Sequence, residues 1–384
     1  MAALEPHAGD GKGPGGAAFA AALIDWHARH GRHDLPWQRA PTPYRVWVSE
    51  VMLQQTQVAT VIGYFERFMQ RFAHPAARAA APLDEVLHLW SGLGYYSRAR
   101  HLHRAAQVLV AEHGGELPAD APALERLPGI GRSTAAAIVA LAHDRRAAIL
   151  DGNVKRVLAR CFGIDGALGE RATEQALWRQ AEACAPERQA AVYTQAIMDF
   201  GATLCTRARP LCMHCPLSAA CVAHRTGRVA QLPGARRRRL RPERQVVMLL
   251  ASRGDGSLLL QRRPARGVWA QLWTPPEFPD LAGAEAFCCT SLAAAELEPA
   301  PLPPLRHAFT HFDLTITPLR ARCAGAAAAV MDGDGSLWYN PRRPVRVGLP
   351  APIAALLAAM QIETQIETQI DPRARPAAAS QELP

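Results

Sequence analysis

Four cysteines lie close together near the middle of the chain, with a spacing that suits a metal centre. They are Cys205, Cys212, Cys215 and Cys221, separated by six, two and five residues. Four thiolates this close in sequence bind either zinc or an iron–sulfur cluster. Zinc sites more often pair two Cys-x-x-Cys units, and only one such unit is present. The spacing therefore favours an iron–sulfur cluster, and zinc remains the alternative.

The loop between the first two of these cysteines is basic. It contains Arg207 and Arg209. A metal centre would fix both ends of this loop, so that the two arginine side chains can contact phosphate oxygens. The alternative is a loop that contacts only solvent, which would have the same basic residues. The chain has nine cysteines, an odd number, which argues for a ligand cluster in a reducing compartment over a disulfide framework.

A glycine-rich turn at residues 127–131 has the character of an anion site. Gly129 and Gly131 permit a tight turn whose backbone N–H groups face outward at the start of the next helix. On a chain with a formal charge of +9, the expected anion is a nucleic-acid phosphate, contacted without regard to base sequence. An ordinary corner between two helices is the alternative.

An aspartate follows the apolar run 147–150. Asp151 is well placed to cap the helix that begins after it, and helix capping is the default role for such a residue. A carboxylate held beside a helix N-terminus can also face a developing cation. The two roles are compatible.

A glutamate stands in an otherwise apolar helical pattern over residues 45–69. Glu50, Gln54 and Gln57 fall at i, i+4 and i+7, so they make one polar stripe on that predicted helix. If Glu50 lies in a closed pocket, desolvation raises its pKa and makes the carboxyl a general acid. An exposed glutamate would give the same sequence pattern.

The elements that must position these residues are mostly helices. From residue 17 to 225, apolar residues recur at three-and-four spacing between short Gly, Pro or His breaks, which predicts an almost entirely α-helical region. Residues 45–69 are predicted to form one long helix, or two with a bend near Gly63. Further helices are predicted over residues 83–90 and 97–113.

The composition changes after this region. Residues 226–243 are rich in Gly, Pro and Arg and are predicted to be a linker, and residues 244–360 are predicted to form an α+β domain. Its expected elements are strands over 245–251 and 257–261 joined through Asp255-Gly256, a strand pair within 305–321, and helices over 284–295 and 352–360. Residues 1–16 and 361–384 are predicted to be disordered, the latter with a Gln-Ile-Glu-Thr repeat.

Length and charge narrow the class of protein. The 384 residues suit two or three domains, and 43 Lys and Arg against 34 Asp and Glu suit a polyanionic partner. No stretch approaches the ~18 uninterrupted apolar residues of a membrane span, and the N-terminus lacks the basic start and apolar run of a secretory signal. We therefore expect a cytoplasmic protein without a membrane anchor.

Taken together, these segments closely resemble the bacterial adenine DNA glycosylases, the MutY family of the helix-hairpin-helix base-excision superfamily. The resemblance runs from about residue 20 to 358, and its strongest segments are residues 35–37, 47–58, 92–96, 127–134, 149–160 and the four cysteines. It implies removal of adenine paired with 8-oxoguanine or guanine in double-stranded DNA. It also implies one 4Fe-4S cluster, and an all-α glycosylase region followed by a Nudix-like α+β domain. We expect a monomer at the bacterial nucleoid, with repair or replication proteins as further partners.

The resemblance also implies roles for individual residues. Glu50 would protonate the extruded adenine at N7, while Asp151, helped by Asn153, would stabilise the oxocarbenium-like sugar. Gln55 and Tyr95 would enter the base stack that the adenine leaves, and Ser133 would line the pocket. The other implied pocket and DNA-binding residues are Trp37, Gln54, Gly129, Gly131, Lys155, Arg207 and Arg209, and the four cysteines would hold the cluster.

In the second domain, Phe309-Thr310-His311 is similar to the Phe-Ser-His loop with which this family contacts 8-oxoguanine. Thr310 replaces the serine, so the hydroxyl is kept and a methyl group is added. The domain lacks the acidic Arg-Glu-x-x-Glu-Glu helix that binds metal in nucleotide pyrophosphatases. We therefore expect no pyrophosphatase activity.

Two other functions fit parts of the sequence. An endonuclease III type of glycosylase with lyase activity on oxidised pyrimidines shares the helical region, the cluster and the turn, but it carries a Schiff-base lysine where this chain has Ser133. Lys155 lies near enough in sequence to react adventitiously with an abasic aldehyde. The second alternative is a non-catalytic iron–sulfur DNA-binding protein, against which the retention of both Glu50 and Asp151 argues.

Overall fold

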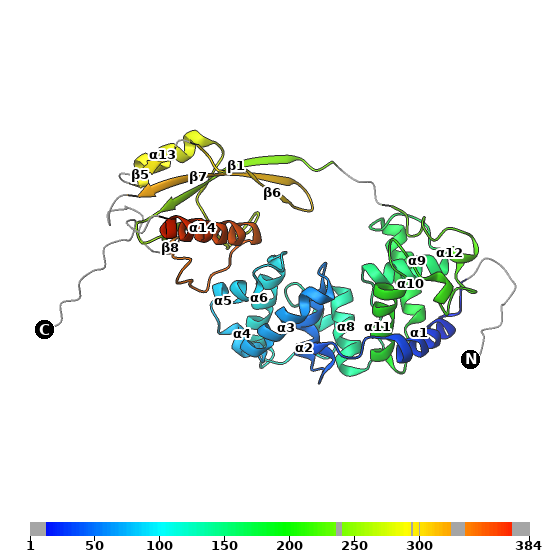
Figure 1. Cartoon of the computed structure of the whole chain (residues 1–384). Coiled ribbons are helices and arrows are strands. Elements are labelled where there is room, and N and C mark those ends of the chain that lie inside the picture. The colour runs from blue at the N-terminus through cyan, green and yellow to red at the C-terminus, as the bar shows by residue number, and fades with distance from the viewer. Residues whose placement is uncertain (1–12, 236–239, 293–294, 299, 324–334, 371–384) are drawn as a thin grey trace. The chain divides into compact units, whose positions relative to one another are not determined.

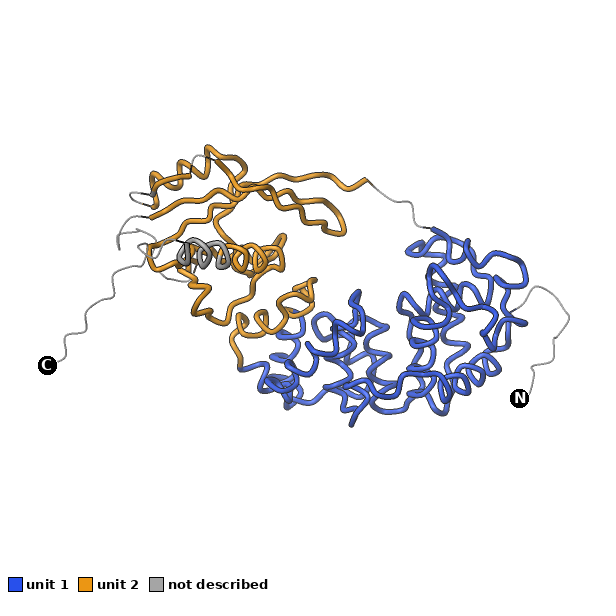
Figure 2. The backbone as a smooth tube through the Cα atoms, in the orientation of Figure 1, with its two compact units in different colours: residues 1–80, 101–238 blue, residues 81–100, 239–384 orange. Residues whose placement is uncertain are grey.

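The computed structural model describes the chain except residues 1–12, 236–239, 293–294, 299, 324–334 and 371–384. The chain divides into two compact units, residues 1–80 with 101–238 and residues 81–100 with 239–384 (Figure 2). Segment 81–100, which we expected in the helical region, thus packs with the C-terminal residues. Within the described residues, no helix has the length and apolar character needed to cross a membrane.

The first unit is helical, as the sequence predicts (Figure 1). Residues of α1, α9, α10 and α11 share one apolar core, in which Phe19, Trp26 and Phe200 are among the largest buried side chains. The helices are α1 (Gly16–His30), α2 (Pro43–Leu53), α3 (Val58–Arg71), α4 (Pro75–Ala79), α6 (Ser97–Glu112, shared with the second unit), α7 (Ala121–Glu125), α8 (Arg132–His143), α9 (Gly152–Phe162), α10 (Arg171–Cys184), α11 (Ala190–Asp199) and α12 (Val222–Arg225). Short helical turns are η1 (Pro36–Gln38), η2 (Phe200–Leu204) and η3 (Cys212–His214).

The predicted helix over residues 45–69 is two helices, and the break is not near Gly63. Helix α2 ends at Leu53 and α3 begins at Val58, so Gly63 lies inside α3. Gln55, between them, has the left-handed φ of 57°, which an uninterrupted helix cannot contain. The expected polar stripe therefore does not exist on one helix, because Gln54 caps the end of α2 and Gln57 the start of α3.

The second unit is a mixed sheet with helices, as predicted. Strand order is β3-β2-β1-β7-β5, with β4 also paired to β1, β6 to β7 and β8 to β2. The strands are β1 (Glu243–Ser252), β2 (Leu258–Arg262), β3 (Trp273–Thr274), β4 (Glu277–Phe278), β5 (Ala295–Leu297), β6 (Leu305–Ala308), β7 (Asp313–Cys323) and β8 (Ser336–Tyr339). The helices are α5 (Leu83–Trp90), α13 (Leu281–Ser291) and α14 (Ala351–Ile370).

Apolar residues at alternate positions of β1 and β7 form one hydrophobic core on one face of the sheet. Val247 and Leu249 of β1 and Leu319 of β7 pack against Ala284 and Cys288 of α13. Figure 1 shows α13 on one side of the sheet and α14 on the other. Strands β1 and β7 run parallel, a pairing that the sequence pattern did not indicate, whereas the predicted hairpin β1–β2 and strand pair β6–β7 are confirmed.

The predicted linker and tail differ from the structure at their edges. Residues 226–234 pack within the first unit, where Leu232 is buried and Gly234 bridges Ala167. Part of the expected linker, residues 236–239, lies outside the described residues. Helix α14 continues to Ile370, ten residues into the segment for which we expected no structure, while residues 371–384 lie outside the described part.

Candidate active site

Several predicted site residues line one cavity in the first unit. Its volume of about 320 Å³ lies within the range of small-molecule pockets. Of the predicted residues, the cavity wall contains Trp37, Glu50, Gln54, Ser133, Asp151 and Asn153. It also contains Arg32, Leu35, Leu53, Thr56, Val58, Thr134, Gln195, Met198 and Ala202. Sequence segments more than 100 residues apart therefore converge on this hollow.

Glu50 reaches the cavity from the last turn of α2. Burial raises its pKa from 4.5 to about 8, and the negative charge of Asp151 adds to the increase. A carboxyl with this pKa holds its proton at neutral pH. The hypothesis that Glu50 lies in a closed pocket is thus supported by its surroundings, although the polar stripe that suggested it is absent.

Asp151 occupies the N-cap position of α9, as predicted. Its Oδ1 accepts a hydrogen bond of 2.7 Å from the backbone N–H of Val154. Burial raises the pKa of Asp151, while this hydrogen bond and the charges of Arg156 and Lys155 oppose the increase. The residue is therefore a buried carboxyl whose charged form has several stabilising neighbours.

Ser133 holds in place the chain segment that leads to Asp151. Its Oγ, at the start of α8, accepts a 2.9 Å hydrogen bond from the backbone N–H of Leu150. The neighbouring Thr134 accepts a 3.3 Å hydrogen bond from Gln54 Nε2, at the end of α2. The first turn of α8 therefore ties together the two segments that carry the carboxyl groups.

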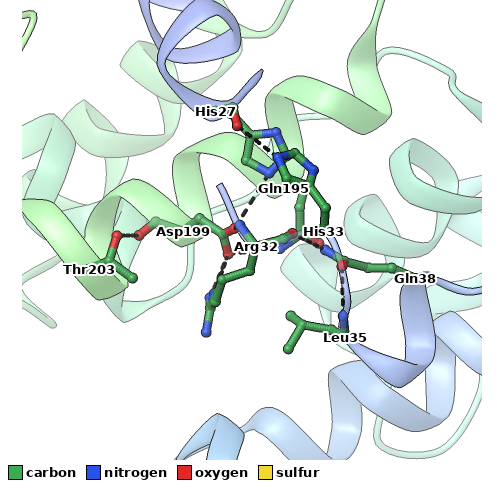
Figure 3. A network of polar contacts seen from close by, with 8 residues as sticks. All are labelled: His27, Arg32, His33, Leu35, Gln38, Gln195, Asp199 and Thr203. Carbon is green, nitrogen blue, oxygen red and sulfur yellow. Dashed lines mark hydrogen bonds and ion pairs between the residues drawn. The ribbon is translucent and has the colours of Figure 1, made fainter. Parts of the chain in front are cut away.

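A buried ionic network that includes two residues of the cavity wall was missed by sequence reasoning (Figure 3). Asp199, fully buried on α11, accepts hydrogen bonds from the backbone N–H and Nε of Arg32 at 2.8 and 3.0 Å. Its Oδ1 also accepts a 2.9 Å bond from Gln195 Nε2, and His27 Nε2 lies 3.4 Å from Oδ2.

The network fixes the orientation of two cavity residues, Arg32 and Gln195. Burial favours a raised pKa for Asp199, but hydrogen bonds from His27 and Arg32 and the charge of Arg32 outweigh it and lower the pKa. Because Gln195 donates its amide N–H to Asp199, its carbonyl oxygen remains as the acceptor that can serve the cavity. No motif in the sequence marked these residues.

Helix α9 connects the cavity to the cysteine segment. Arg156 donates to Asn153 Oδ1 at 2.9 Å and to the carbonyl oxygen of Cys205 at 2.8 Å. One turn further on, Arg160 donates to the carbonyl oxygen of Thr206 at 2.7 Å and to Cys205 Sγ at 3.4 Å. Two arginines of one helix therefore fix the start of the basic loop.

The four predicted cysteine ligands border one small, apolar cavity. Cys221 is buried and the other three are partly buried. Among the residues that the structure describes, no group of three or more His, Cys, Asp or Glu side chains has an arrangement that could hold a metal ion. The all-thiolate donor set and its shared cavity still fit an iron–sulfur group, in which each cysteine binds its own iron.

The predicted DNA-binding residues lie in different settings. Gly129 has φ of 80°, and a Cβ there would stand 2.5 Å from His101 Cβ, so the turn requires glycine. Lys155 forms a 2.7 Å ion pair with Glu174 and does not line the cavity. The exposed residues are Gln55 between α2 and α3, Gly129 and Gly131 in the turn, and Arg207 and Arg209 in the cysteine loop.

The remaining four predicted residues lie in the second unit. Thr310 and His311 are exposed in the connection between β6 and β7, where Phe309 stacks on Phe312 with ring centroids 4.6 Å apart. Tyr95, in the segment between α5 and α6, exposes 43% of its surface. Thr310, His311 and Tyr95 are accessible, as DNA contacts require.

The sequence is similar to proteins of known families along most of its length. The family described as "HhH-GPD superfamily base excision DNA repair protein" matches residues 48–183, and the NUDIX domain family matches residues 246–359. An adenine DNA glycosylase of Buchnera aphidicola is 34% identical over 340 residues, covering 88% of this chain and 96% of the relative. An adenine DNA glycosylase of Rattus norvegicus is 35% identical over 382 residues, covering 84% and 74%. A solved thermostable thymine-DNA glycosylase covers 54% of this chain and 95% of its own, at 27% identity and a TM-score of 0.49.

Proposed function

Since the chain belongs to the adenine DNA glycosylases of the HhH-GPD superfamily, we propose that it hydrolyses the bond between adenine and deoxyribose when the base opposite is 8-oxoguanine or guanine. It is a base-excision repair enzyme that acts on adenine mispairs in DNA. The choice of 8-oxoguanine, the chemical steps and the residue roles below are our proposal. The observation that carries it is the shared cavity of Glu50 and Asp151.

Glu50 is the general acid in this proposal. With a pKa of about 8 it is protonated at neutral pH, and it faces a cavity that suits a base swung out of the duplex. Transfer of its proton to N7 lets adenine leave with the electron pair of the glycosidic bond. The Glu50 carboxylate then takes a proton from the water that adds to the sugar, which restores the acid.

Asp151 stabilises the sugar cation that adenine leaves behind. The backbone N–H of Val154 and the nearby charges of Arg156 and Lys155 favour its ionised form. Two neighbouring carboxyl groups with different surroundings can thus divide the work, one acting as acid and the other as anion. Asn153, on the first turn of α9 and also at the cavity wall, assists by binding the sugar.

Gln195 and Arg32 contact the extruded base. The amide N–H of Gln195 is engaged by Asp199, so its carbonyl oxygen suits the exocyclic amino group of adenine. A base with a carbonyl at that position offers no donor, which disfavours it. Trp37 packs against Phe65 with ring centroids 5.5 Å apart and forms an apolar wall.

The four cysteines would hold one 4Fe-4S cluster. Cys205, Cys212, Cys215 and Cys221 would bind one iron each, as the all-thiolate set and shared cavity favour. When bound, the cluster supplies thiolate–iron bonds that fix the loop. Arg207 and Arg209 then face the phosphate backbone, while the turn at Gly129 and Gly131 binds a second phosphate.

The second unit reads the opposing base. Thr310 and His311 are the exposed hydrogen-bonding side chains of the β6–β7 connection, and we assign them to contact with 8-oxoguanine. Tyr95 and Gln55, both exposed, fill the base stack where the adenine was. Stacking by such side chains offsets part of the free-energy cost of base extrusion.

Strand cleavage through a Schiff base is not part of this function. Ser133 has no amine, and its hydroxyl is engaged with the N–H of Leu150. Lys155 is engaged with Glu174, partly buried, and absent from the cavity wall. These contacts favour a monofunctional glycosylase over the lyase alternative.

The test is release of free adenine under single-turnover conditions from duplexes that differ only in the opposing base. We expect release opposite 8-oxoguanine and guanine, fastest opposite 8-oxoguanine, and strand breaks only after alkali treatment. Duplexes with thymine glycol test the rival activity. Release of thymine glycol without release of adenine would overturn the proposal.

A further inference from the structure

The loop that carries Tyr95 belongs to the same compact unit as the lesion-reading segment. Residues 81–100 pack with residues 239–384, although more than 200 residues separate Tyr95 from Phe309 in the sequence (Figure 2). Two DNA contacts of the proposed function thus share one structural body. The contacts inside this unit show how they are connected.

The Tyr95 loop has an unusual backbone. Gly92, Gly94 and Tyr95 have φ of 100°, 70° and 47°, and the last value is disfavoured for a tyrosine. Trp90 Nε1 and Arg98 Nη2 both donate to the carbonyl oxygen of Gly94, at 3.1 and 3.2 Å. A strained residue needs such contacts around it, because without them the chain relaxes to a commoner conformation.

Tyr96 joins this loop to the C-terminal part of the chain. Its hydroxyl accepts a 3.3 Å hydrogen bond from the backbone N–H of Gly92 and donates a 2.9 Å bond to the carbonyl oxygen of Leu349. The side chain is only 7% exposed. One hydroxyl group therefore links the start of the loop to the segment that precedes α14.

Helix α5, which leads into the Tyr95 loop, also contacts the C-terminal part of the chain, at Arg262, Trp273 and Gly348. Asp84 forms an ion pair with Arg262 and accepts a 3.1 Å hydrogen bond from Trp273 Nε1. At Gly348, a Cβ would stand 2.6 Å from Leu87 Cβ, so only glycine permits this close approach. The contact between α5 and the C-terminal part of the chain is therefore polar at its edge and tightly packed at its centre.

The segment 269–273 connects this contact to the lesion-reading residues. The Trp269 ring lies 5.4 Å from the Phe309 ring and 5.6 Å from the His307 ring, measured between centroids. The next residue, Ala270, accepts a 2.8 Å hydrogen bond through its carbonyl oxygen from Arg100 Nη1, in the first turn of α6. Trp273, at the end of this segment, donates a 2.9 Å hydrogen bond from its backbone N–H to the carbonyl oxygen of Gly348, next to the Leu349 partner of Tyr96. Contacts thus run from Phe309 to both sides of the Tyr95 loop and to Tyr96.

We propose that Tyr96 is a positioning residue, through which the body that reads the opposing base also sets the conformation of the Tyr95 loop. This inference rests on the proposed function, in which residues 309–311 contact 8-oxoguanine and Tyr95 enters the base stack. Contact with 8-oxoguanine fixes the lesion-reading segment and, through Tyr96, holds Tyr95 ready to replace the departing base. Recognition of the lesion then favours extrusion of the adenine opposite it.

The test compares Tyr96→Phe with a matched control, Tyr44→Phe, in the full-length chain. Tyr44 is also buried, with 6% exposed, and its hydroxyl donates a 2.8 Å hydrogen bond to the Phe72 carbonyl oxygen and accepts one from Arg78. Tyr44→Phe therefore removes a comparable pair of hydrogen bonds in the first unit. Single-turnover adenine release is measured opposite 8-oxoguanine and opposite guanine. Tyr96→Phe should lower the 8-oxoguanine-to-guanine rate ratio by about fivefold, the worth of one hydrogen bond. Tyr44→Phe should leave this ratio unchanged.

Two further variants distinguish failure of the Tyr96 inference from failure of the proposed lesion-reading function. Asp84→Asn, which removes the ion pair from the partly exposed edge of the contact, should lower the ratio in the same direction even if Tyr96→Phe folds poorly. His311→Ala should lower the ratio, and Tyr96→Phe added to it should cause no further loss. An unchanged ratio in both Tyr96→Phe and Asp84→Asn, or effects that multiply in the double variant, would overturn the inference. Equal rates opposite both bases in the unmodified protein, or an unchanged ratio in His311→Ala, would instead overturn the lesion-reading function.

Discussion

Glu50 and Asp151 reach one cavity from the last turn of α2 and the N-cap of α9, and the negative charge of Asp151 favours the protonated form of Glu50. Burial does most to keep the proton on Glu50, and the negative charge of Asp151 adds to it. Hydrogen bonding from Val154 favours the anion at Asp151 but not at Glu50. Two carboxyl groups therefore acquire different roles from their positions.

The rate of adenine release should fall as pH rises through about 8. Glu50 is active when protonated, and its raised pKa of about 8 means that the acid form is lost on the alkaline side. The measurement is the single-turnover rate between pH 6.5 and 9.5, with DNA affinity measured at each pH as the control. A rate that stays level or rises between pH 7 and 9 contradicts the assignment of Glu50 as the acid.

Asp151→Asn should lower the single-turnover rate by about a hundredfold to a thousandfold, the usual loss when one electrostatic stabiliser is removed. Asparagine is as good an N-cap as aspartate, so the bond from the Val154 N–H is kept. The midpoint of thermal unfolding should therefore change little. A variant that loses stability and activity together would show that Asp151 serves only as a cap.

Gly129→Ala should destabilise the protein by about 1–3 kcal/mol, because φ of 80° is strained for alanine. The added Cβ would also stand 2.5 Å from His101 Cβ. We expect weaker binding to undamaged DNA as the turn distorts. Urea unfolding and DNA titration measure the two effects, with Gly152→Ala as the control, since nothing lies within 4 Å of a Cβ at that position. Equal effects of the two substitutions would contradict a special role for the turn.

Cys212→Ser should lower the iron and sulfide content of the purified protein and its visible absorbance. It should also weaken DNA binding, because the loop with Arg207 and Arg209 loses its support. Cys289→Ser is the control, since this exposed cysteine lies in the second unit. Full iron content in Cys212→Ser, or zinc in place of iron in the unmodified protein, contradicts the proposed cluster.

Local patterns in the sequence predicted much of the fold. The capping of α9 by Asp151, the exact bounds of α5 and the hairpin at Asp255-Gly256 all depend on neighbouring residues, and each is confirmed. The break after Gln54 was not predictable in this way, because no glycine or proline marks it. Its left-handed residue, Gln55, is not a glycine, so the sequence gives no local sign of the positive φ.

Long-range features were the least accessible to sequence reasoning. The network at Asp199 joins residues 167 positions apart, and an aspartate within a helix gives no sign of such a contact. The parallel pairing of β1 with β7 and the packing of residues 81–100 with the C-terminal part are equally non-local. Glu50 was suggested by a polar stripe that the helix break removes, yet the cavity around it supports the same role.

The most direct test of the central claim is the effect of Glu50→Gln on a duplex with adenine opposite 8-oxoguanine. Glutamine keeps the shape of the side chain but cannot deliver a proton. We predict that binding to the duplex persists while the single-turnover release of adenine falls by about a hundredfold or more, as expected for loss of a general acid. Adenine release at the unmodified rate, with binding intact, would contradict the account.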